Sequence, residues 1–571
     1  MIQYLPLGSD NVGYTKNKYF WLWIIIAVAL IAIIAVIILR ETQDKTENDD
    51  GEPIIDIDDR ISPGIKQGLF VQIDRIRRRG LEEQMRTYGR KIPKPNPYYC
   101  VITTDGTIFN SSILSTAQGS GSGLLTIWDT GYDFIQVSED IPEEQPESMI
   151  SLQIIEIQPK RGIFGKETHV ELEKIDLTYD YRTGRWSGDD TLDDTDGYGH
   201  YLGENCEVWF TLTQTDPDGD NIPYWTEVNI LHTDPFVDDS QVDPDQDGIP
   251  TAWEWKWEYD PYIPNNHTIL DPDSDGLPNS IEYHLQEWLA NPFYQDIYVE
   301  VDGMQSSGKR SDYPVYMLWN ESQQMVIEKF SRHAITLHID DGRMGEGGDI
   351  VPYAETTVPE MGMYEYYHNS FSDDRKGIFH YCLISHRAGW IFPQDAGNTY
   401  DAFSVSGSRD VFWADYGLNN IFYSLLHPDL SFFNPRTKYV WLASLFMHEL
   451  GHSIGLMPGY CQELVPDELK ENDTTYYFYG NDNQSIKFLE GDTFQEQWKN
   501  HGEAITYWAN YVSCMNYGNQ GGLILHGLLK PTYSASILDY SDGTHGGHDG
   551  DDWGNIDLTF FQKTAPFIEG A

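Results

Sequence analysis

Three acidic loops in register constrain the fold of this chain more than any other feature of its sequence. In each loop, aspartates stand at positions 1, 3 and 5, an Ile-Pro or Leu-Pro step follows, and a glutamate stands at position 12. This is the ligand pattern of an EF-hand loop, in which carboxylates and one backbone carbonyl surround Ca²⁺. Three copies, 27 and 28 residues apart, favour ligand sets over an ordinary solvated acidic surface. The predicted calcium ligands are Asp216, Asp218, Asp220 and Glu227 in the first loop, Asp243, Asp245, Asp247 and Glu254 in the second, and Asp271, Asp273, Asp275 and Glu282 in the third.

Each loop leads into a short predicted helix, as at Thr251–Tyr259 and Asn279–Ala290. Position 6 is glycine in the second and third loops, whereas Asn221 occupies it in the first. Asparagine tolerates the left-handed backbone needed there, although less readily than glycine. We therefore expect the first loop to bind Ca²⁺, but more weakly than the other two. The segment, residues 216–295, resembles thrombospondin type 3 and dockerin-like calcium repeats, which implies a calcium-stiffened spacer. In such repeats a later Asp or Asn can complete the next site, and residues of this kind precede proline at Asp234, Asp260 and Asn291.

The charge balance limits the partners of this chain. Its 571 residues include 90 acidic and 37 basic ones, which gives a net charge of −53. Nucleic-acid phosphates would be repelled, so we expect no nucleic-acid partner. The acidic excess favours Ca²⁺, an extracellular setting, or both. A chain of this length exceeds one hydrophobic core and predicts several domains.

The N-terminal region contains a long apolar run. Phe20–Leu39 has 20 residues and no charge, enough for one helix to cross a bilayer. Lys16 and Lys18 precede it, and an acidic stretch follows it. The positive-inside tendency then predicts a cytoplasmic tail at residues 1–18, a transmembrane signal anchor at 19–40 that contacts the lipid bilayer through residues 20–39, and an extracellular location for the bulk of the chain.

Residues 41–97 are interpreted as a linker followed by a broken amphipathic helix over Gly64–Arg90. This helix could pack on the next domain or lie on anionic lipid. From residue 98 to 215 the apolar period changes to two, which is typical of a β-sandwich with turn signals between the strands. The predicted strands are Tyr99–Thr104, Leu124–Asp129, Ser151–Gln158, Val170–Tyr181 and Cys206–Thr213.

The distal part, residues 296–571, predicts an α/β layer order. Its expected strands are Asp296–Asp302, Ala334–Ile339, Gly377–Ser385 and Asp410–Ala414, and its expected helices are Val315–Phe330 and Thr437–Leu456. The second helix contains the sequence His448-Glu449-Leu450-Gly451-His452, the pattern H-E-x-x-H. Residues four apart share a helix face, so both imidazoles can point at one Zn²⁺ while Glu449 holds and deprotonates a metal-bound water. Two histidines satisfied by hydrogen bonds in a buried helix would be the alternative.

The motif continues through Gly455, and Met515 stands farther on in Ser513-Cys514-Met515-Asn516-Tyr517. With the strand order, these motifs make the distal domain resemble the metzincins, a clan of zinc endopeptidases. The resemblance implies His448 and His452 as zinc ligands, Glu449 as general base and acid, and Met515 as an apolar floor. It also implies Tyr517 as a catalytic residue that stabilises the tetrahedral intermediate. The predicted fold class is therefore multidomain, with an N-terminal transmembrane helix, a β-sandwich, a calcium-repeat segment and an α/β (α+β) metzincin-like catalytic domain.

The third zinc ligand departs from the clan pattern. Pro458 stands where the clan places that ligand, and proline cannot coordinate a metal. The sequence leaves open which side chain takes this role; the candidates are Glu463, Asp467, Glu468, Glu496, Glu503, His545 and His548. The loop Asp539–Asp552, which contains the two histidines, could equally bind calcium or be solvated.

Two functions follow from these observations. The first is a membrane-anchored extracellular zinc endopeptidase that acts on a protein or peptide substrate. The second is a calcium-dependent surface adhesion or scaffold protein with a catalytically inactive peptidase fold, which the proline at 458 favours. Five cysteines without C-x-x-C spacing argue against a cysteine-based zinc site, and Cys461 with Cys514 is the first disulfide we would expect.

Overall fold

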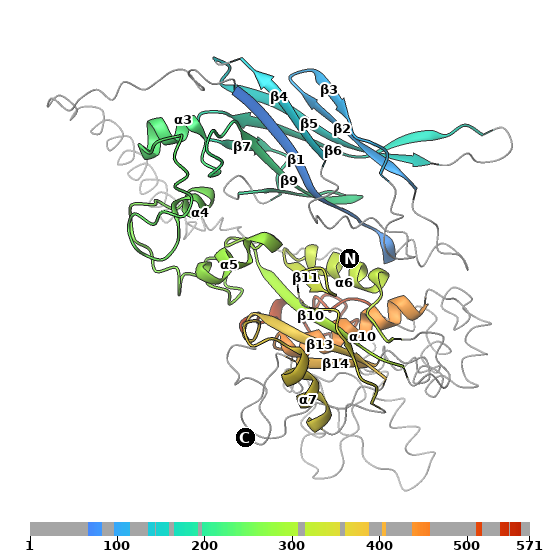
Figure 1. The fold of residues 1–571 in the computed structure, drawn as a ribbon. Helices are drawn as coiled ribbons and strands as arrows, with labels where there is room; N and C mark the ends of the chain where they lie inside the picture. Colours follow the sequence, from blue (N-terminus) through green and yellow to red (C-terminus); the bar gives the residue numbers. More distant parts are fainter. Residues whose placement is uncertain are drawn as a thin grey trace, which may run out of the picture. The chain divides into compact units, whose positions relative to one another are not determined.

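The computed structural model describes most of the chain between residues 67 and 560. The described ranges are residues 67–82, 96–114, 135–142, 144–158, 165–191, 197–306, 315–345, 347–354, 360–386, 402–406, 437–456, 510–516, 537–547 and 549–560. Their strands form three sheets, two of them antiparallel and one parallel (Figure 1).

The first two sheets share one hydrophobic core. One sheet has the order β4 (Ile135–Ile141), β1 (Gln67–Arg78), β9 (Cys206–Gln214) and β8 (Gly199–Leu202). The other has the order β3 (Thr107–Asn110), β2 (Tyr98–Thr104), β5 (Glu147–Gln158), β6 (Thr168–Asp180) and β7 (Arg185–Gly188). Alternate residues of both sheets, such as Val71, Ile102 and Phe210, are buried in the same cluster, so the sheets pack as a sandwich.

Strand β1 corrects the expected amphipathic helix over Gly64–Arg90. It pairs antiparallel with β4 along one edge and with β9 along the other. Its basic side chains at Arg75 and Arg77 are buried beside Trp209, not placed on anionic lipid. Pairing on both edges outweighed the local helical pattern, and the sandwich therefore begins before residue 98. The expected strand Leu124–Asp129 lies outside the described residues.

The segment predicted to bind calcium, residues 216–295, consists of loops and short helices. Helices α3 (Tyr224–Thr226), α4 (Thr251–Lys256) and α5 (Asn279–Leu285) each begin directly after the proline of a loop. Proline suits this place because the first helical residues have no intrahelical acceptor for their N–H groups. A π-helical turn, η1 (Glu227–Leu231), follows α3, and a 3₁₀ turn, η2 (Gln286–Trp288), follows α5. A small aromatic cluster supports the segment and includes Trp209, Trp253 and Trp257.

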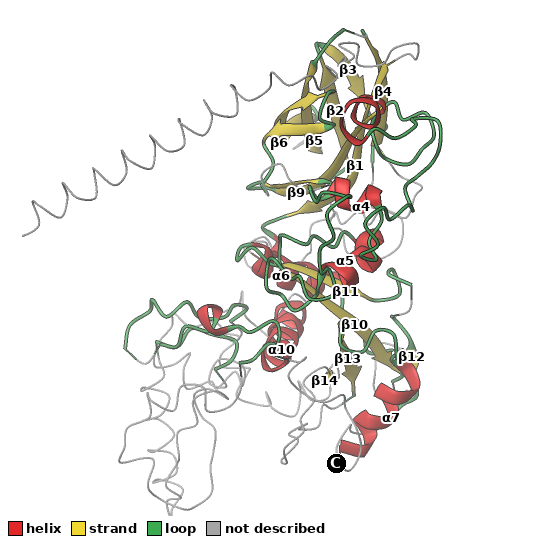
Figure 2. Cartoon of the chain, turned by 90° about the vertical axis from the view of Figure 1, so that its left-hand side faces the viewer, coloured by secondary structure: helices red, strands yellow, loops and turns green. Residues whose placement is uncertain are grey.

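The distal part is built on a parallel sheet with the order β11 (Thr336–Asp340), β10 (Asp296–Met304), β13 (Phe379–Ser385) and β14 (Ala402–Ser406); the two-residue β12 (Ile350–Val351) also pairs with β10. Helices α6 (Asn320–Ser331) and α10 (Thr437–Ser453) lie together on one side of this sheet, and α7 (Glu360–Ser370) lies on the other (Figure 2). A short 3₁₀ turn, η4 (Trp553–Asn555), follows near the C-terminus. The expected strand Asp410–Ala414 lies outside the described residues, and β14 is the last strand of the described sheet.

The membrane expectation is overturned. None of the helices in the described ranges combines the length and the apolar character needed to cross a bilayer. Helix α10 is rich in apolar residues, but its 17 residues fall short of the roughly 20 that a span needs, and it buries them in the distal core. This finding contradicts the N-terminal transmembrane helix in the predicted fold class and the single-pass placement with an extracellular bulk. The predicted anchor at residues 19–40, with its bilayer contact, lies outside the described residues.

Candidate functional site

The three acidic loops adopt the same hydrogen-bonded geometry. In each, the aspartate at position 1 accepts the backbone N–H of position 6, at 2.7 Å for Asn221, 2.9 Å for Gly248 and 3.1 Å for Gly276. The aspartate at position 5 accepts the N–H of position 7 in all three loops, at 2.8, 3.0 and 2.7 Å. Position 6 has a positive φ throughout, 69° at Asn221, 102° at Gly248 and 96° at Gly276. Backbone donors thus fix the orientation of these carboxylates, and each carboxylate oxygen keeps a further lone pair for a cation.

The glutamates at position 12 lie at the centre of each loop. Glu227, Glu254 and Glu282 are at most 1% exposed, and Glu254 and Glu282 have no hydrogen-bond partner on either carboxylate oxygen. Burial, followed by the charge of Asp273, raises the pKa of Glu282 to about 11. Buried carboxylates this close together repel one another unless a cation compensates them, and each loop offers enough oxygens to bind Ca²⁺.

The structure adds a donor to the first and second loops that the sequence reasoning missed. Asp239 lies with Asp220 and Glu227 in one potential metal-binding group, and His267 lies with Asp247 and Glu254 in another. Asp296 contacts the third loop differently: its N–H donates to Asp275, while its own carboxylate accepts from the Asn291 N–H and His338 Nε2. Burial, followed by the charge of Asp296, raises the pKa of Asp275 to about 8.

The only sequence signal for Asp239 and His267 is spacing, since they follow the position-12 glutamate of their loop by 12 and 13 residues. The residues before proline have a different role. Asp234, Asp260 and Asn291 each accept the N–H of the residue two positions later, so they close turns.

The H-E-x-x-H motif lies on the last turns of α10. His448 and His452 bring their Nε2 atoms to 3.2 Å, with ring centroids 4.8 Å apart. Two ligands bound tetrahedrally at about 2.0–2.1 Å from one zinc ion would be roughly 3.3–3.4 Å apart, so the separation fits shared coordination. His448 is 1% exposed, and Glu449 is partly exposed beside it.

Backbone carbonyls fix which nitrogen of each imidazole carries the proton. His448 Nδ1 lies 2.9 Å from the carbonyl oxygen of Cys514, and His452 Nδ1 lies 2.7 Å from that of Leu456. A carbonyl can only accept, so both Nδ1 atoms donate and each neutral ring keeps its Nε2 lone pair for a metal. Gly455 makes the second contact possible. Its φ of 95° turns the chain so that the Leu456 N–H donates to the Gly451 carbonyl at 2.9 Å.

The Met515 turn packs directly beneath this motif. Met515 is fully buried, and its N–H donates to Ser513 Oγ at 3.0 Å. A Cβ on Gly451 would stand 2.8 Å from Met515 Sδ and 3.0 Å from Tyr540 Oη. A larger residue at 451 would force Met515 or Tyr540 to shift, so this glycine lets the turn pack closely against the helix between the two histidines. The turn also supplies the Cys514 carbonyl that orients His448.

The third zinc ligand is not supplied by the residues that form this group. Across the described ranges, the metal-ligating group here comprises His448, Glu449 and His452. His545 belongs to another group with Asp542 and Asp549, and its Nδ1 lies 3.0 Å from an Asp549 oxygen. Tyr517, Cys461 and the remaining third-ligand candidates, Glu463, Asp467, Glu468, Glu496, Glu503 and His548, lie outside the described residues.

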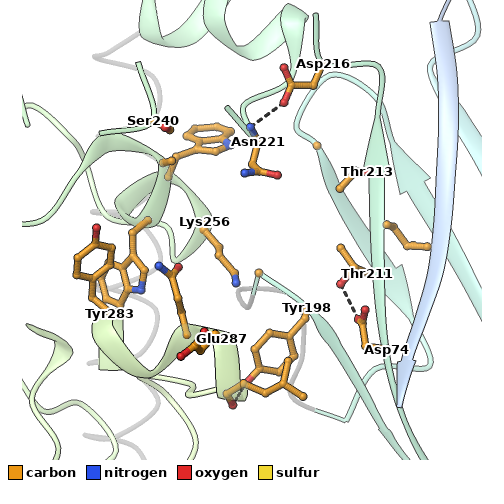
Figure 3. A pocket seen from close by; sticks show the side chains of 18 of the residues that line it. Asp74, Tyr198, Thr211, Thr213, Asp216, Asn221, Ser240, Lys256, Tyr283 and Glu287 are labelled. Atoms are coloured by element: carbon orange, nitrogen blue, oxygen red, sulfur yellow. Dashed lines mark hydrogen bonds between the residues drawn. The ribbon is translucent and has the colours of Figure 1, made fainter. Parts of the chain in front are cut away.

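A separate cavity of about 490 Å³ opens beside the first acidic loop and shares no residue with the His448 group. Asp216 and Asn221 stand on one part of its wall, Tyr283 and Lys256 on another, and Tyr198 faces it as well (Figure 3). Two residues of the first loop therefore line the cavity, so a cation bound in that loop would affect the shape of the cavity.

Comparison with protein-family models and with curated proteins finds no match to this chain. The metzincin and thrombospondin type 3 resemblances therefore rest on the motifs quoted above, and function must be argued from the geometry of the two kinds of site.

Proposed function

We propose that the chain is a zinc-dependent endopeptidase whose distal domain binds the metal through His448 and His452 and uses Glu449 as general base. The observation that carries this proposal is the pair of Nε2 atoms at 3.2 Å, each freed for a metal because a carbonyl holds the opposite nitrogen. The three acidic loops bind Ca²⁺ in the same proposal and stiffen the segment before the catalytic domain.

The residues of this site divide the chemistry between them. A zinc ion bound there would polarise both the attacking water and the scissile carbonyl. Glu449 accepts one proton of that water as its oxygen bonds to the carbonyl carbon, and it delivers the proton to the amine nitrogen as the C–N bond breaks. The turn at Met515 keeps water from beneath the two ligands and holds the carbonyl that orients His448. The proposal requires a third protein ligand, and Tyr517 as a further stabilising group.

A second candidate is a calcium-dependent scaffold or adhesion protein with an inactive site. It is favoured by Pro458, which stands at the position of the clan's third ligand. It is also favoured by the described metal-ligating group, which contains His448, Glu449 and His452 and no third ligand of the kind the clan uses.

The test compares Glu449→Gln, His452→Ala and a control, His368→Ala, which removes an exposed histidine from α7. Zinc per chain is measured by elemental analysis, and hydrolysis is followed with casein. Glu449→Gln is expected to keep zinc and lose at least about 100-fold in rate. His452→Ala is expected to lose one zinc per chain relative to wild type, and the control to resemble wild type. Equal hydrolysis by all four proteins, or wild type without zinc, would refute the peptidase in favour of the scaffold.

A further inference from the structure

The second acidic loop differs from the first in the chemistry of one donor. The first loop receives a carboxylate from Asp239, whereas His267 occupies the comparable place in the second. The four carboxylates at positions 1, 3, 5 and 12 are otherwise the same residue types in all three loops. An imidazole nitrogen therefore replaces an oxygen in this loop.

The imidazole points into the ligand cluster. His267 Nε2 lies 3.3 Å from an Asp247 oxygen and 3.7 Å from a Glu254 oxygen. Ligands at about 2.0–2.2 Å from one metal ion are separated by roughly 3.0–3.6 Å across most coordination angles, so the three donors nearly match a common centre.

Burial supplies independent support for a ligand. His267 is 1% exposed and Glu254 is 0% exposed, and neither His267 Nε2 nor either Glu254 oxygen makes a hydrogen bond. Apart from the long His267 contacts to Asp247 and Glu254, these atoms have no polar partner, and a buried polar atom without a hydrogen bond costs about 1–3 kcal/mol. Coordination of a cation would satisfy all three together.

The surroundings of His267 hold its ring in a coordinating orientation. The ring makes edge contacts with Trp253 and Tyr259, at centroid distances of 5.7 and 4.9 Å. Its Nδ1 lies 3.0 Å from the side-chain amide of Asn279, whose Oδ1 has no hydrogen-bond partner. Rotating this amide by half a turn sets Oδ1 against an Nδ1–H donor, which satisfies the oxygen and leaves the Nε2 lone pair to the metal.

We propose that the second loop is a mixed nitrogen–oxygen site for a divalent transition metal of the zinc class, bound by His267 Nε2, Asp247 and Glu254. Imidazole suits Zn²⁺ and its neighbours in the first transition row, whereas Ca²⁺ takes oxygen ligands. The ligand atoms that lie together in this loop come from Asp247, Glu254 and His267. The first and third loops remain calcium sites. This inference does not depend on the peptidase activity of the distal domain.

The experiment uses the full chain with His448→Ala and His452→Ala, so that the distal histidines no longer bind zinc. This variant is dialysed against micromolar ZnCl₂ with millimolar CaCl₂, and both metals are counted per chain. One zinc is expected to remain. Adding His267→Asp should recreate an all-oxygen donor set like that of the first loop, weaken zinc binding at least about 10-fold, and add one calcium. His284→Asp, which makes the same change at an exposed histidine of α5, should retain the zinc.

Absence of zinc from the distal double variant would overturn the proposal, as would zinc binding that is unchanged by His267→Asp. Should His267→Asp fail to fold, X-ray absorption of the zinc-loaded distal double variant decides the question. A first shell containing one imidazole nitrogen is expected, and a shell of oxygen alone would refute the assignment. The peptidase proposal is tested separately by the single variant His267→Asp, in which His448 and His452 are intact. Absence of zinc from that variant would show that the distal histidines do not bind zinc.

Discussion

The buried carboxylate of Glu207 provides the sharpest test of the electrostatics of the sandwich. Its two oxygens accept hydrogen bonds from Arg77 Nη1 at 2.7 Å and from His200 Nε2 at 2.9 Å, and all three side chains are at most 2% exposed. Burial acts to raise the pKa of Glu207, but the charge of Arg77 and the hydrogen bond from His200 outweigh it and lower the pKa to about 2.

The shift predicts how stability depends on pH. The pKa of Glu207 falls from 4.5 to about 2, and at about 1.4 kcal/mol per pKa unit this corresponds to roughly 3 kcal/mol. Because the folded-state pKa is lowered, the contribution is fully present above pH 4.5 and is lost as the pH falls toward 2. Glu207→Gln removes the charge and leaves Arg77 buried without its counter-ion, a change that costs about 3–5 kcal/mol in other buried pairs.

Urea unfolding at saturating calcium, followed by tryptophan fluorescence, measures the difference. We expect Glu207→Gln to unfold with about 3 kcal/mol less free energy than wild type at pH 7, and the gap to shrink toward zero near pH 2. Glu171→Gln is the matched control, because that glutamate is exposed on β6 and should change stability by no more than about 0.5 kcal/mol. A gap at Glu207 that is independent of pH, or smaller than that of the control, would refute the reasoning.

Two further perturbations test the candidate sites. Gly451→Ala places a Cβ 2.8 Å from Met515 Sδ and should destabilise the distal domain by about 1–3 kcal/mol and reduce its zinc content. Gly547→Ala is the control, because nothing lies within 4 Å of its Cβ, and it should change neither quantity. Equal zinc content in the two variants would contradict the proposed contact. Chelation with EGTA should make residues 216–295 sensitive to protease, since a ligand at about 100 times its Kd contributes roughly 2.7 kcal/mol per site, and an unchanged digestion pattern would count against calcium binding there.

Much of each metal-binding motif is local and could therefore be predicted from the sequence. The four carboxylates of an acidic loop lie within 12 residues, and the N–H groups that orient the aspartates come from the same loop, so Asp243, Gly248 and Glu254 specify most of their own geometry. The same holds for His448 and His452, which one helical turn brings together without help from any other segment.

The partners of these local motifs come from elsewhere in the chain, and only the tertiary structure decided them. His267 reaches the second loop from beyond its helix, and the carbonyl that fixes the tautomer of His448 belongs to Cys514, 66 residues later. Strand β1 is a second example, because its arginines fit the polar face of a helix when the segment is considered alone. In the structure, Arg77 is buried against Glu207 and Trp209 on the paired strand β9. The hydrophobic period of a segment indicates its local secondary structure. Whether a charge or an imidazole in that segment can be buried depends on a compensating group from a distant part of the chain, which the period does not reveal.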